Sequence, residues 1–255
     1  MSVLKNMLQP ALRSVLKSAL DIPFTPFDIA GLIGWNTTYD PSTITYNESN
    51  LVSAWANLNE ASSFTQGTTE LKPTYSAPFL TFDGTSDYMQ DDTVPPSIAN
   101  WTSARTYIVN VEVATTPVGS LFEIEATSSN FRDERIFFNA SNQISFISNH
   151  GDDDVELTGS QPSAGMHTFF VTVKSNTDNR VPTLYQDNTS LATATSMGAG
   201  SIVPNSLTIG AKADGGGYLI PANFTNCSMK DIMLFNKTLD TTERANITAF
   251  FRSRD

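Results

Sequence analysis

Apolar and polar residues alternate along most of the chain from residue 29 onward. In TYIVNVEVAT (106–115), for example, every second residue is apolar. Because strand side chains point to opposite faces in turn, this alternation predicts a β-strand with one face against a core. Short strands at regular spacing are typical of an all-β sandwich or barrel. The further predicted strands are 120–126, a hairpin over 135–148, 167–175, 182–195, 207–212 and 228–237.

The first twenty residues follow helical spacing instead. Lys5, Arg13 and Lys17 lie off an apolar stripe, and Pro10 starts, kinks or splits the helix. Three interpretations stay open: the helix packs on its own domain, lies on a membrane surface, or docks on a partner subunit. We favour docking or self-association, so that the segment is an assembly arm. Its apolar stripe consists of Leu4, Leu8, Leu12, Leu16 and Leu20.

Prolines mark the boundary between this arm and the rest of the chain. Pro23 and Pro26 in DIPFTPFD favour extended backbone and stop the preceding helix. We therefore divide the chain into a helical arm with its linker, residues 1–28, and a sandwich domain, residues 29–255.

A second helix is predicted near residue 240. In LDTTERANITAFFRSR, Asp240 is a good N-cap, and Glu243 completes a capping-box pattern. Ile247, Phe250 and Phe251 fall on one face of the segment. This spacing predicts a short C-terminal helix or turn that closes the sandwich.

Composition narrows the class of partner. The formal net charge is −11, which argues against nucleic acid and against anionic membrane surfaces, because both need clustered Lys and Arg. No apolar run approaches the ~18 residues of a membrane span. The single cysteine, Cys227, allows no intramolecular disulfide, which suits a reducing cytoplasm. We interpret Cys227 as a small buried residue.

Two acidic segments are candidate calcium sites. In FLTFDGTSDYM, Asp83 and Asp87 surround an Asp-Gly turn signal. We favour a strand-end turn there, and the alternative is a carboxylate pair that holds calcium. In GDDDVE, Asp152 and Asp154 share one face of an extended segment and are a second candidate pair, although a solvated turn is the favoured interpretation. Calcium is the one cofactor that these patterns suggest.

Catalysis has little support in the sequence. Glu123 and Glu125 lie on one face of a predicted strand, about 7 Å apart by strand rise. Retaining glycosidases need about 5–5.5 Å, so the spacing is nearly usable, but we favour two outward-facing acids on a half-solvated strand. His150 and His167 lack metal-binding spacing, and no G-x-S-x-G motif occurs. We predict that the protein is not an enzyme.

Aromatic residues suggest another function, because sugar rings stack on aromatic faces. Trp101, in IANWTSARTY, and Tyr88 are the candidate glycan-binding residues. Trp35 and Trp55 sit among apolar neighbours and are predicted core residues. Asp and Asn side chains on loops would supply hydrogen bonds to sugar hydroxyls.

Several segments occur in an order that resembles a known superfamily. They are LIGWNTTYDPSTIT (32–45), FLTFDGTSDYM (79–89), GMHTFFVTV (165–173), TLYQDNTSLATA (183–194) and the closing region 207–247. In this order they resemble the concanavalin A-like lectin/glucanase superfamily, in particular its laminin G-like jelly-roll domains. The resemblance implies a two-sheet antiparallel jelly-roll sandwich.

The resemblance also bears on activity. Laminarinase-like relatives carry an E-x-D-x-x-E pattern, whereas this chain has Glu125 where Asp is expected and Ser128 where the acid/base Glu should stand. Sandwiches of this kind with a short amphipathic arm resemble structural proteins of tailed-phage particles.

These patterns together lead to one functional hypothesis. The chain is predicted to be a non-catalytic structural or adhesion protein of a phage virion, on the capsid surface, in a fibre or in the tail, assembled in the host cytoplasm. Its arm would bind other virion proteins or further copies in a homo-oligomer, and its sandwich would bind cell-surface glycans. The alternatives are a glycoside hydrolase and a free soluble lectin on the same fold.

Overall fold

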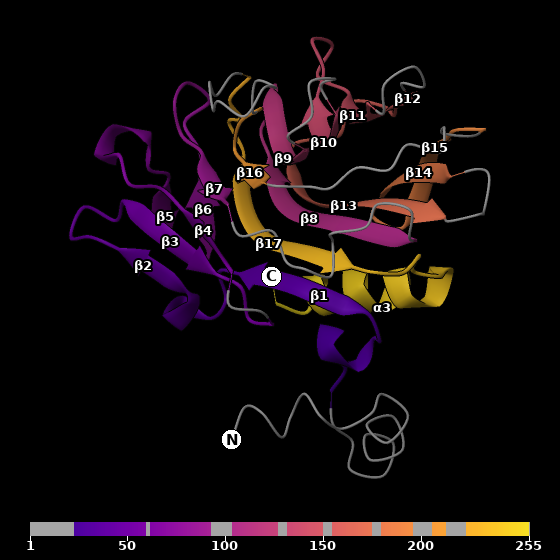
Figure 1. The fold of residues 1–255 in the computed structure, drawn as a ribbon, viewed down its shortest axis with the longest axis horizontal. Helices are drawn as coiled ribbons and strands as arrows, with labels where there is room; N and C mark the ends of the chain where they lie inside the picture. The colour runs from indigo at the N-terminus through magenta and orange to yellow at the C-terminus, as the bar shows by residue number, and fades with distance from the viewer. Residues whose placement is uncertain are drawn as a thin grey trace.

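Two antiparallel sheets and one C-terminal helix make up the described part of the chain (Figure 1). The computed structural model describes residues 23–59, 62–92, 104–126, 132–149, 155–174, 180–195, 206–212 and 223–254. The predicted all-β, two-sheet antiparallel sandwich with a short C-terminal helix is confirmed. The predicted arm, with its stripe from Leu4 to Leu20, lies outside the described residues.

The first sheet, sheet A, has eight strands. Its order is β15-β14-β13-β8-β17-β6-β5, and β1 pairs with β17 beside this path. The long central strands β8 and β13 pair over nine register positions, from Gly165 opposite Val113 to Val173 opposite Arg105. The strands are β1 (Leu32–Thr37), β5 (Thr74–Ser76), β6 (Phe79–Thr81), β8 (Arg105–Val113), β13 (Gly165–Lys174), β14 (Val181–Gln186), β15 (Thr189–Thr193) and β17 (Ser228–Phe235).

The second sheet, sheet B, has nine strands in the order β12-β11-β10-β9-β16-β7-β4-β3-β2. A predicted hairpin forms β10 and β11, with Asn142 in a left-handed conformation at its turn. The strands are β2 (Ile44–Tyr46), β3 (Val52–Ala56), β4 (Ser63–Thr65), β7 (Met89–Asp91), β9 (Gly119–Ala126), β10 (Arg132–Phe138), β11 (Ile144–Ser148), β12 (Val155–Thr158) and β16 (Ser206–Ile209).

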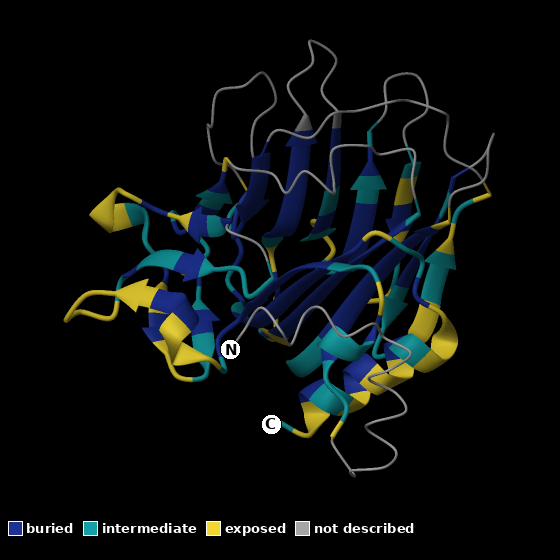
Figure 2. Ribbon diagram, turned by 60° about the horizontal axis from the view of Figure 1, so that its bottom comes forward, coloured by how far each residue is buried: buried dark blue, intermediate teal, exposed yellow. Residues whose placement is uncertain are grey.

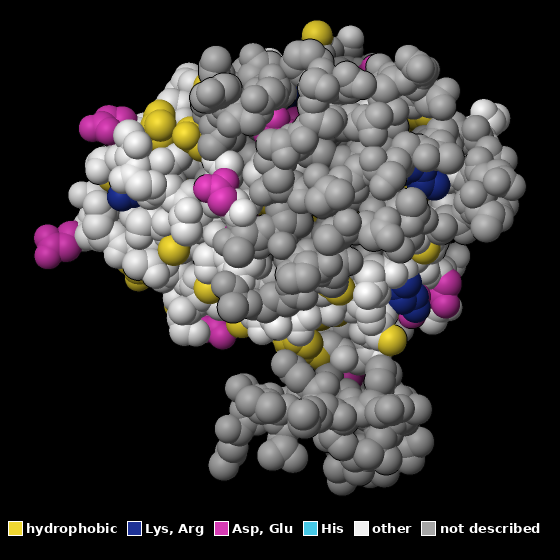
Figure 3. Space-filling model, in the orientation of Figure 1, with side chains coloured by type: hydrophobic (Ala, Val, Ile, Leu, Met, Phe, Trp, Pro, Cys, Tyr) yellow, Lys and Arg dark blue, Asp and Glu magenta, His cyan; other side chains and the backbone are white. Residues whose placement is uncertain are grey.

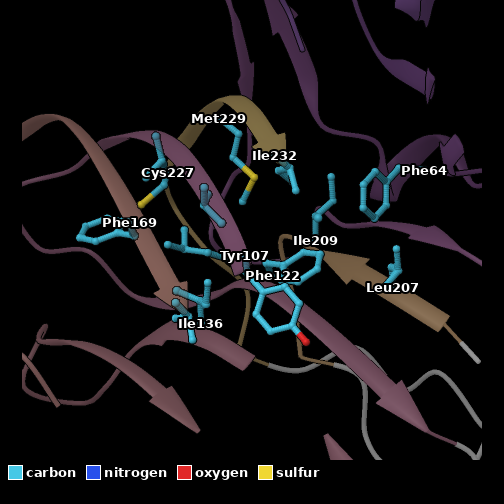
Figure 4. Packing of buried hydrophobic residues seen from close by; sticks show 14 of the residues in the cluster. Phe64, Tyr107, Phe122, Ile136, Phe169, Leu207, Ile209, Cys227, Met229 and Ile232 are labelled. Carbon is cyan, nitrogen blue, oxygen red and sulfur yellow. The ribbon is translucent and has the colours of Figure 1, made fainter. Parts of the chain in front are cut away.

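The main core fills the space between the sheets (Figures 2 and 4). Inward residues of β8, such as Tyr107, pack against Phe122 of β9, with ring centroids 5.8 Å apart. Trp55 is fully buried, as predicted, and Cys227 is buried in the same cluster. Each buried Phe or Leu contributes about 1.5–3 kcal/mol by removal from water, so this layer supplies most of the fold's stability.

One buried ion pair joins the sheets. The Arg105 guanidinium of β8 contacts the Glu134 carboxylate of β10, with Nε to Oε2 at 3.0 Å. Tyr107 donates a hydrogen bond to the same carboxylate at 2.6 Å, and Ser148 donates one at 3.1 Å. A buried carboxylate is tolerated when its oxygens are paired in this way.

A second apolar cluster covers the outer face of sheet A. Helix α3 (Thr241–Arg252) places Ile247 and Phe251 against Phe170 and Met233, and its capping box between Asp240 and Glu243 forms as predicted. Figure 2 shows the buried side of α3 against the sheet and its exposed side toward solvent. The remaining members include Trp35, which is 5% exposed, and the short 3-10 helix η1 (Pro26–Asp28) packs beside it through Phe27.

Two further 3-10 turns complete the described elements, η2 (Pro41–Thr43) and η3 (Thr69–Leu71). In the described part of the chain, no helix is long and apolar enough to cross a bilayer. On the face in Figure 3, Lys and Arg side chains of the described residues are scattered rather than gathered into one patch.

Candidate functional site

A row of residues crosses all nine strands on the outer face of sheet B. Their neighbours along each strand, such as Phe122 and Ile124 beside Glu123, point into the core. The strand register places the row members side by side, so their side chains form one continuous surface. We call this set the outer row: Thr45, Ala54, Thr65, Gln90, Thr208, Glu123, Arg135, Ile147 and Glu156.

Two acidic residues of this face, Glu123 and Glu125, are buried, which corrects a prediction. Glu123 is 1% exposed and Glu125 is 7% exposed, so the expected half-solvated pair is wrong. Strand β9 lies between β10 and β16, and Arg135 and Thr208 flank Glu123 on both sides. Glu125 accepts a hydrogen bond from Ser206 at 3.4 Å.

A β-bulge resets the register next to these residues. Ile136 is opposite Phe122, but the next residue, Phe137, is opposite Ser120, so Leu121 is the extra residue. Leu121 therefore joins the core instead of sharing the face of Glu123, contrary to simple alternation. The bulge brings the Ser120 hydroxyl beside Phe137 on the outer face.

Arg135 is the most unusual member of the outer row. Its guanidinium carbon lies 4.4 Å from the centroid of the Phe137 ring, so the two groups stack. Its Nε and Nη1 atoms are buried and have no hydrogen-bond partner among the described residues. An unpaired buried donor costs about 1–3 kcal/mol, and more when it is charged. Such groups are rare in native proteins, and a binding site is one place where they are retained.

A pocket of about 540 Å³ opens beside Arg135. The Ser120 hydroxyl in its wall is also buried without a hydrogen-bond partner. The exposed side chain of Val118 stands in the same wall. The lining residues are Gly84, Val118, Gly119, Ser120, Arg135, Phe137, Phe138, Asn139, Ala140, Asn223 and Phe224.

Backbone packing shapes one wall of this pocket. Gly119 has a positive φ of 82°, and a Cβ there would lie 2.1 Å from the Phe224 carbonyl oxygen. Only glycine fits this close approach. Ser120 N–H donates to the Asn223 carbonyl at 2.8 Å, and Val118 N–H donates to the Asn226 side chain at 3.1 Å. The pocket is therefore built by a fixed backbone rather than by a loose loop.

These groups suit a polyhydroxylated ligand that carries an anion. The free guanidinium donors fit a carboxylate, the Ser120 hydroxyl and the Asn139 amide fit sugar hydroxyls, and the Phe137 ring offers an apolar face. The volume lies within the range of small-molecule sites, about 300–1,000 Å³.

The Asp83 and Asp87 carboxylates are used inside a turn. Asp83 Oδ1 accepts backbone N–H bonds from Thr85, Ser86 and Asp87 at 2.8–3.0 Å. Burial opposes ionisation of Asp83, but these hydrogen bonds outweigh it and lower its pKa. Asp87 Oδ2 accepts the Asp83 N–H at 3.1 Å. This geometry supports the strand-end turn, and calcium at this pair stays a prediction.

Asp87 differs from Asp83 in its electrostatics. Burial, and then the negative charge of Asp83, raises the pKa of Asp87 to about 6. Within the described ranges, no three His, Cys, Asp or Glu side chains form a group that could hold a metal ion. The other predicted calcium ligands, Asp152 and Asp154, lie outside these ranges.

The sequence did not predict that His167 would meet an acid and a serine. His167 Nδ1 lies 2.7 Å from Asp187 Oδ2, and its Nε2 lies 3.3 Å from Ser163 Oγ. Nε2 also lies 2.9 Å from the Ser163 carbonyl oxygen, which can only accept a hydrogen bond. Gln186 Nε2 lies 3.1 Å from Nδ1 as well. The hydrogen bond to Asp187 raises the pKa of His167. These contacts join the start of β13 to the turn that follows β14.

One of the two predicted glycan-binding aromatics lies among the described residues. Tyr88 is half-buried and is not part of the pocket lining, and Trp101 lies outside the described residues. Trp35 is a core residue, as predicted. Arg135 and Phe137 were not predicted as site residues. Their signal in the sequence is an arginine that directly precedes an apolar run, RIFF, in which Phe137 has the same outward parity as Arg135.

Comparisons with known proteins show the same kind of fold. No protein-family model and no curated protein sequence matches the chain. Trypanosoma rangeli sialidase in complex with sialic acid matches with a TM-score of 0.60 and 13% identity, over 94% of this chain and 38% of the sialidase. A covalent-intermediate structure of that sialidase also gives 0.60, with 14% identity, over 86% of this chain and 33% of the sialidase.

A smaller protein matches over nearly its whole length. The Ruminococcus gnavus IT-sialidase CBM40 bound to α2,3 sialyllactose has a TM-score of 0.53 and 12% identity, over 67% of this chain and 95% of its own. The chain thus spans only about a third of the sialidases that it matches. At these identities the likeness shows the fold, which is a lectin-like β-sandwich similar to regions of sialidases.

Proposed function

We propose that the chain is a non-catalytic glycan-binding module and that the pocket beside Arg135 holds the sugar. The observation that carries this proposal is the Arg135 guanidinium, with two buried, unpaired nitrogens, stacked on Phe137. A ligand that accepts hydrogen bonds from these nitrogens removes the free-energy cost of the unpaired buried donors. The pocket then gains affinity from groups that are already in place.

The chemistry of the pocket favours sugars that carry a carboxylate. An arginine binds a carboxylate through charge-assisted hydrogen bonds, which are about twice as strong as neutral ones. Two structures of similar fold are complexes with sialic acid or α2,3 sialyllactose, which supports an acidic sugar as the ligand. The net charge of −11 opposes an anionic ligand at long range, so we expect weak single-site binding.

The second part of the proposal concerns assembly. A weakly binding module gains strength when many copies are displayed together. The amphipathic segment of residues 1–20 would supply such display by joining the module to a larger particle, and a tailed-phage virion is the particle that we propose. The support is the sequence pattern of the segment and the resemblance of the chain to virion proteins.

A multivalent glycan panel tests the first part. The chain, displayed on beads, is expected to retain α2,3 sialyllactose more strongly than lactose, which lacks the acidic sugar. Arg135→Ala should reduce this retention at least tenfold, whereas Arg252→Ala, an exposed arginine on α3, should leave it unchanged. Equal retention by wild type and Arg135→Ala, or no retention of any panel glycan by the wild type, overturns the proposal.

Removal of the arm tests the second part. Deletion of residues 1–20 should convert an oligomer to a monomer in analytical ultracentrifugation, with binding of a single glycan unchanged. A full-length chain that is monomeric at all concentrations and attaches to no particle contradicts the assembly role.

A further inference from the structure

A buried carboxylate lies on the outer face of sheet A, whereas the pocket beside Arg135 belongs to sheet B. Asp231 of β17 is 0% exposed. Trp35 Nε1 donates to its Oδ1 at 3.0 Å, and Asn110 Nδ2 donates to its Oδ2 at 3.1 Å. These donors, with the Thr37 side chain, orient the carboxylate but do not balance its charge, and burial raises the pKa of Asp231. A buried anion of this kind needs a cation.

Arg254 supplies the cation from beyond the end of α3. Its Nη1 lies 3.5 Å from Asp231 Oδ1, and its Nη2 donates to Thr37 Oγ1 at 3.0 Å. The side chain is 17% exposed, so one edge of the guanidinium still reaches solvent. The contact to Asp231 is longer than a strong hydrogen bond, which indicates that other contacts also fix the position of the Arg254 guanidinium.

Aromatic rings provide the rest of the contact. The guanidinium carbon of Arg254 lies 3.6 Å from the Tyr39 ring centroid, 4.8 Å from that of Phe250 and 5.8 Å from that of Trp35. A cation within about 6 Å of a ring face is attracted by the ring quadrupole. The 3.6 Å separation is a stacking distance, and a planar guanidinium can lie flat on the ring, whereas a tetrahedral ammonium cannot.

The main chain of Arg254 is also bound by Tyr39. The Tyr39 hydroxyl donates to the Arg254 carbonyl oxygen at 2.7 Å, and Lys230 Nζ donates to the Tyr39 hydroxyl at 3.1 Å. Tyr39 thus binds both the side chain and the main chain of Arg254.

We propose that Asp231, Trp35, Tyr39 and Phe250 form a binding site specific for a guanidinium group, with Arg254 as its tethered ligand. Trp35 and Tyr39 belong to β1 and the residues after it, and Asp231 belongs to β17, so these three groups are held independently of the segment that carries Arg254. Phe250 belongs to α3, four residues before Arg254. When Arg254 is removed, the site accepts a guanidinium from another source, either a small molecule or an arginine side chain of a partner polypeptide. The guanidinium group that occupies the site then determines how strongly α3 packs on sheet A.

Chemical rescue tests this site in the full-length chain. Arg254→Ala should lower Tm by about 3–6 °C, because a cation and its ring contacts are lost. Ethylguanidinium chloride at millimolar concentration should recover at least half of that loss, through preferential binding to the folded state. Ethylammonium chloride should recover much less. Neither salt should raise the Tm of the wild type, whose site is filled.

Two variants make the result decisive. In Arg254→Ala with Asp231→Asn, ethylguanidinium should give no rescue, because the charge partner is gone. Arg254→Gln provides a more conservative background if the alanine variant does not fold. Calorimetric titration of the folded variant should show saturable binding of ethylguanidinium, and an arginine-containing tripeptide should compete for it. A site that shows no saturable binding, or that binds ethylammonium equally well, overturns the proposal. If ethylguanidinium binds but the tripeptide does not compete for the site, the site serves Arg254 alone, and binding of an arginine from a partner polypeptide is overturned.

Discussion

The outer faces of the two sheets are built in opposite ways. The outer face of sheet A is covered by α3 and η1, and its central residues form an apolar cluster with Phe170 and Met233. The outer face of sheet B carries the outer row, and no described helix covers it. On sheet A the buried Asp231 has hydrogen-bond partners and a cation, whereas on sheet B the Arg135 nitrogens Nε and Nη1 have none.

This contrast indicates which outer face stabilises the fold and which outer face binds a ligand. A face that satisfies its polar groups and buries apolar area is stabilising, and changes there should appear as a loss of folding free energy. A face that keeps unpaired donors gives up stability, which native proteins accept mainly at functional sites. Mutations on the outer face of sheet B should therefore change glycan binding more than the free energy of unfolding.

The largest expected effect is on the sheet A side. Phe251→Ala removes a fully buried ring that packs α3 on the sheet, and the free energy of unfolding should fall by about 3–5 kcal/mol. Denaturant unfolding measures this change. Asn246→Ala, at an exposed position of the same helix, should change it by less than about 0.5 kcal/mol. A loss below about 1 kcal/mol for Phe251→Ala would mean that α3 does not stabilise this face.

Two turns provide a second contrast. The turn from β6 of sheet A to β7 of sheet B places two acids together, Asp83 and Asp87. The pKa of Asp87 is raised to about 6, from 3.8, so its ionised form is disfavoured in the folded state. The wild type should lose stability as the pH rises from about 4 to 6. Asp87→Asn should therefore stabilise the protein by about 1 kcal/mol at pH 7.5, after allowance for solvent screening, and by almost nothing at pH 4. Destabilisation at pH 7.5 would show that the charge of Asp87 is needed.

The turn after β14 of sheet A pairs opposite charges instead, because Asp187 there meets His167 of β13. The pKa of His167 is raised above 6.5 by its hydrogen bond to Asp187. Burial opposes ionisation of Asp187, but hydrogen bonds from His167 and Thr168 lower its pKa below 3.8. The histidine contribution is lost as the pH rises through its folded pKa, and the aspartate contribution is lost as the pH falls through its own. Both groups are charged between about pH 4 and 6.5.

Asp187→Asn should therefore destabilise the protein by about 0.5 kcal/mol near pH 5.5, since the pair is partly exposed. Thermal unfolding at a series of pH values measures this difference, which should shrink at pH 8.5. A constant difference across this range would show that the ion pair contributes nothing and that only the loop conformation matters.

The smallest stability effect is expected on the outer row itself. Thr208 Oγ1 is buried without a hydrogen-bond partner, so Thr208→Val should be neutral or slightly stabilising, within about 0.5 kcal/mol. Glycan retention on beads reports whether this hydroxyl also contacts ligand. A loss above about 1 kcal/mol would show that Thr208 has a structural partner after all.

The sequence predicted the fold well because alternation and capping are local signals. The inward residues of β8, the β10–β11 hairpin and the Asp240 cap of α3 lie where the pattern puts them. Alternation alone would put Leu121 on the face of Glu123, but it lies in the core, because a bulge depends on the pairing of β9 with β10 rather than on β9 alone.

The candidate site was much harder to predict. Arg135, Ser120 and Asn223 are far apart in the chain. The pairing of β9 with β10 brings Arg135 and Ser120 together, and the hydrogen bond from Ser120 N–H to the Asn223 carbonyl adds Asn223 to the same pocket. The sequence also could not show that Arg135 lacks partners, because pairing is a property of the folded arrangement. Glu123 and Glu125 were predicted to be solvated for the same reason, since burial of an outer face depends on neighbouring strands.

A crystal structure of the chain soaked with α2,3 sialyllactose tests the central claim most directly. Our account predicts the sugar in the pocket of sheet B, with its carboxylate at the Arg135 guanidinium and its ring beside Phe137. A sugar bound on another surface, with Arg135 still unpaired, would contradict it.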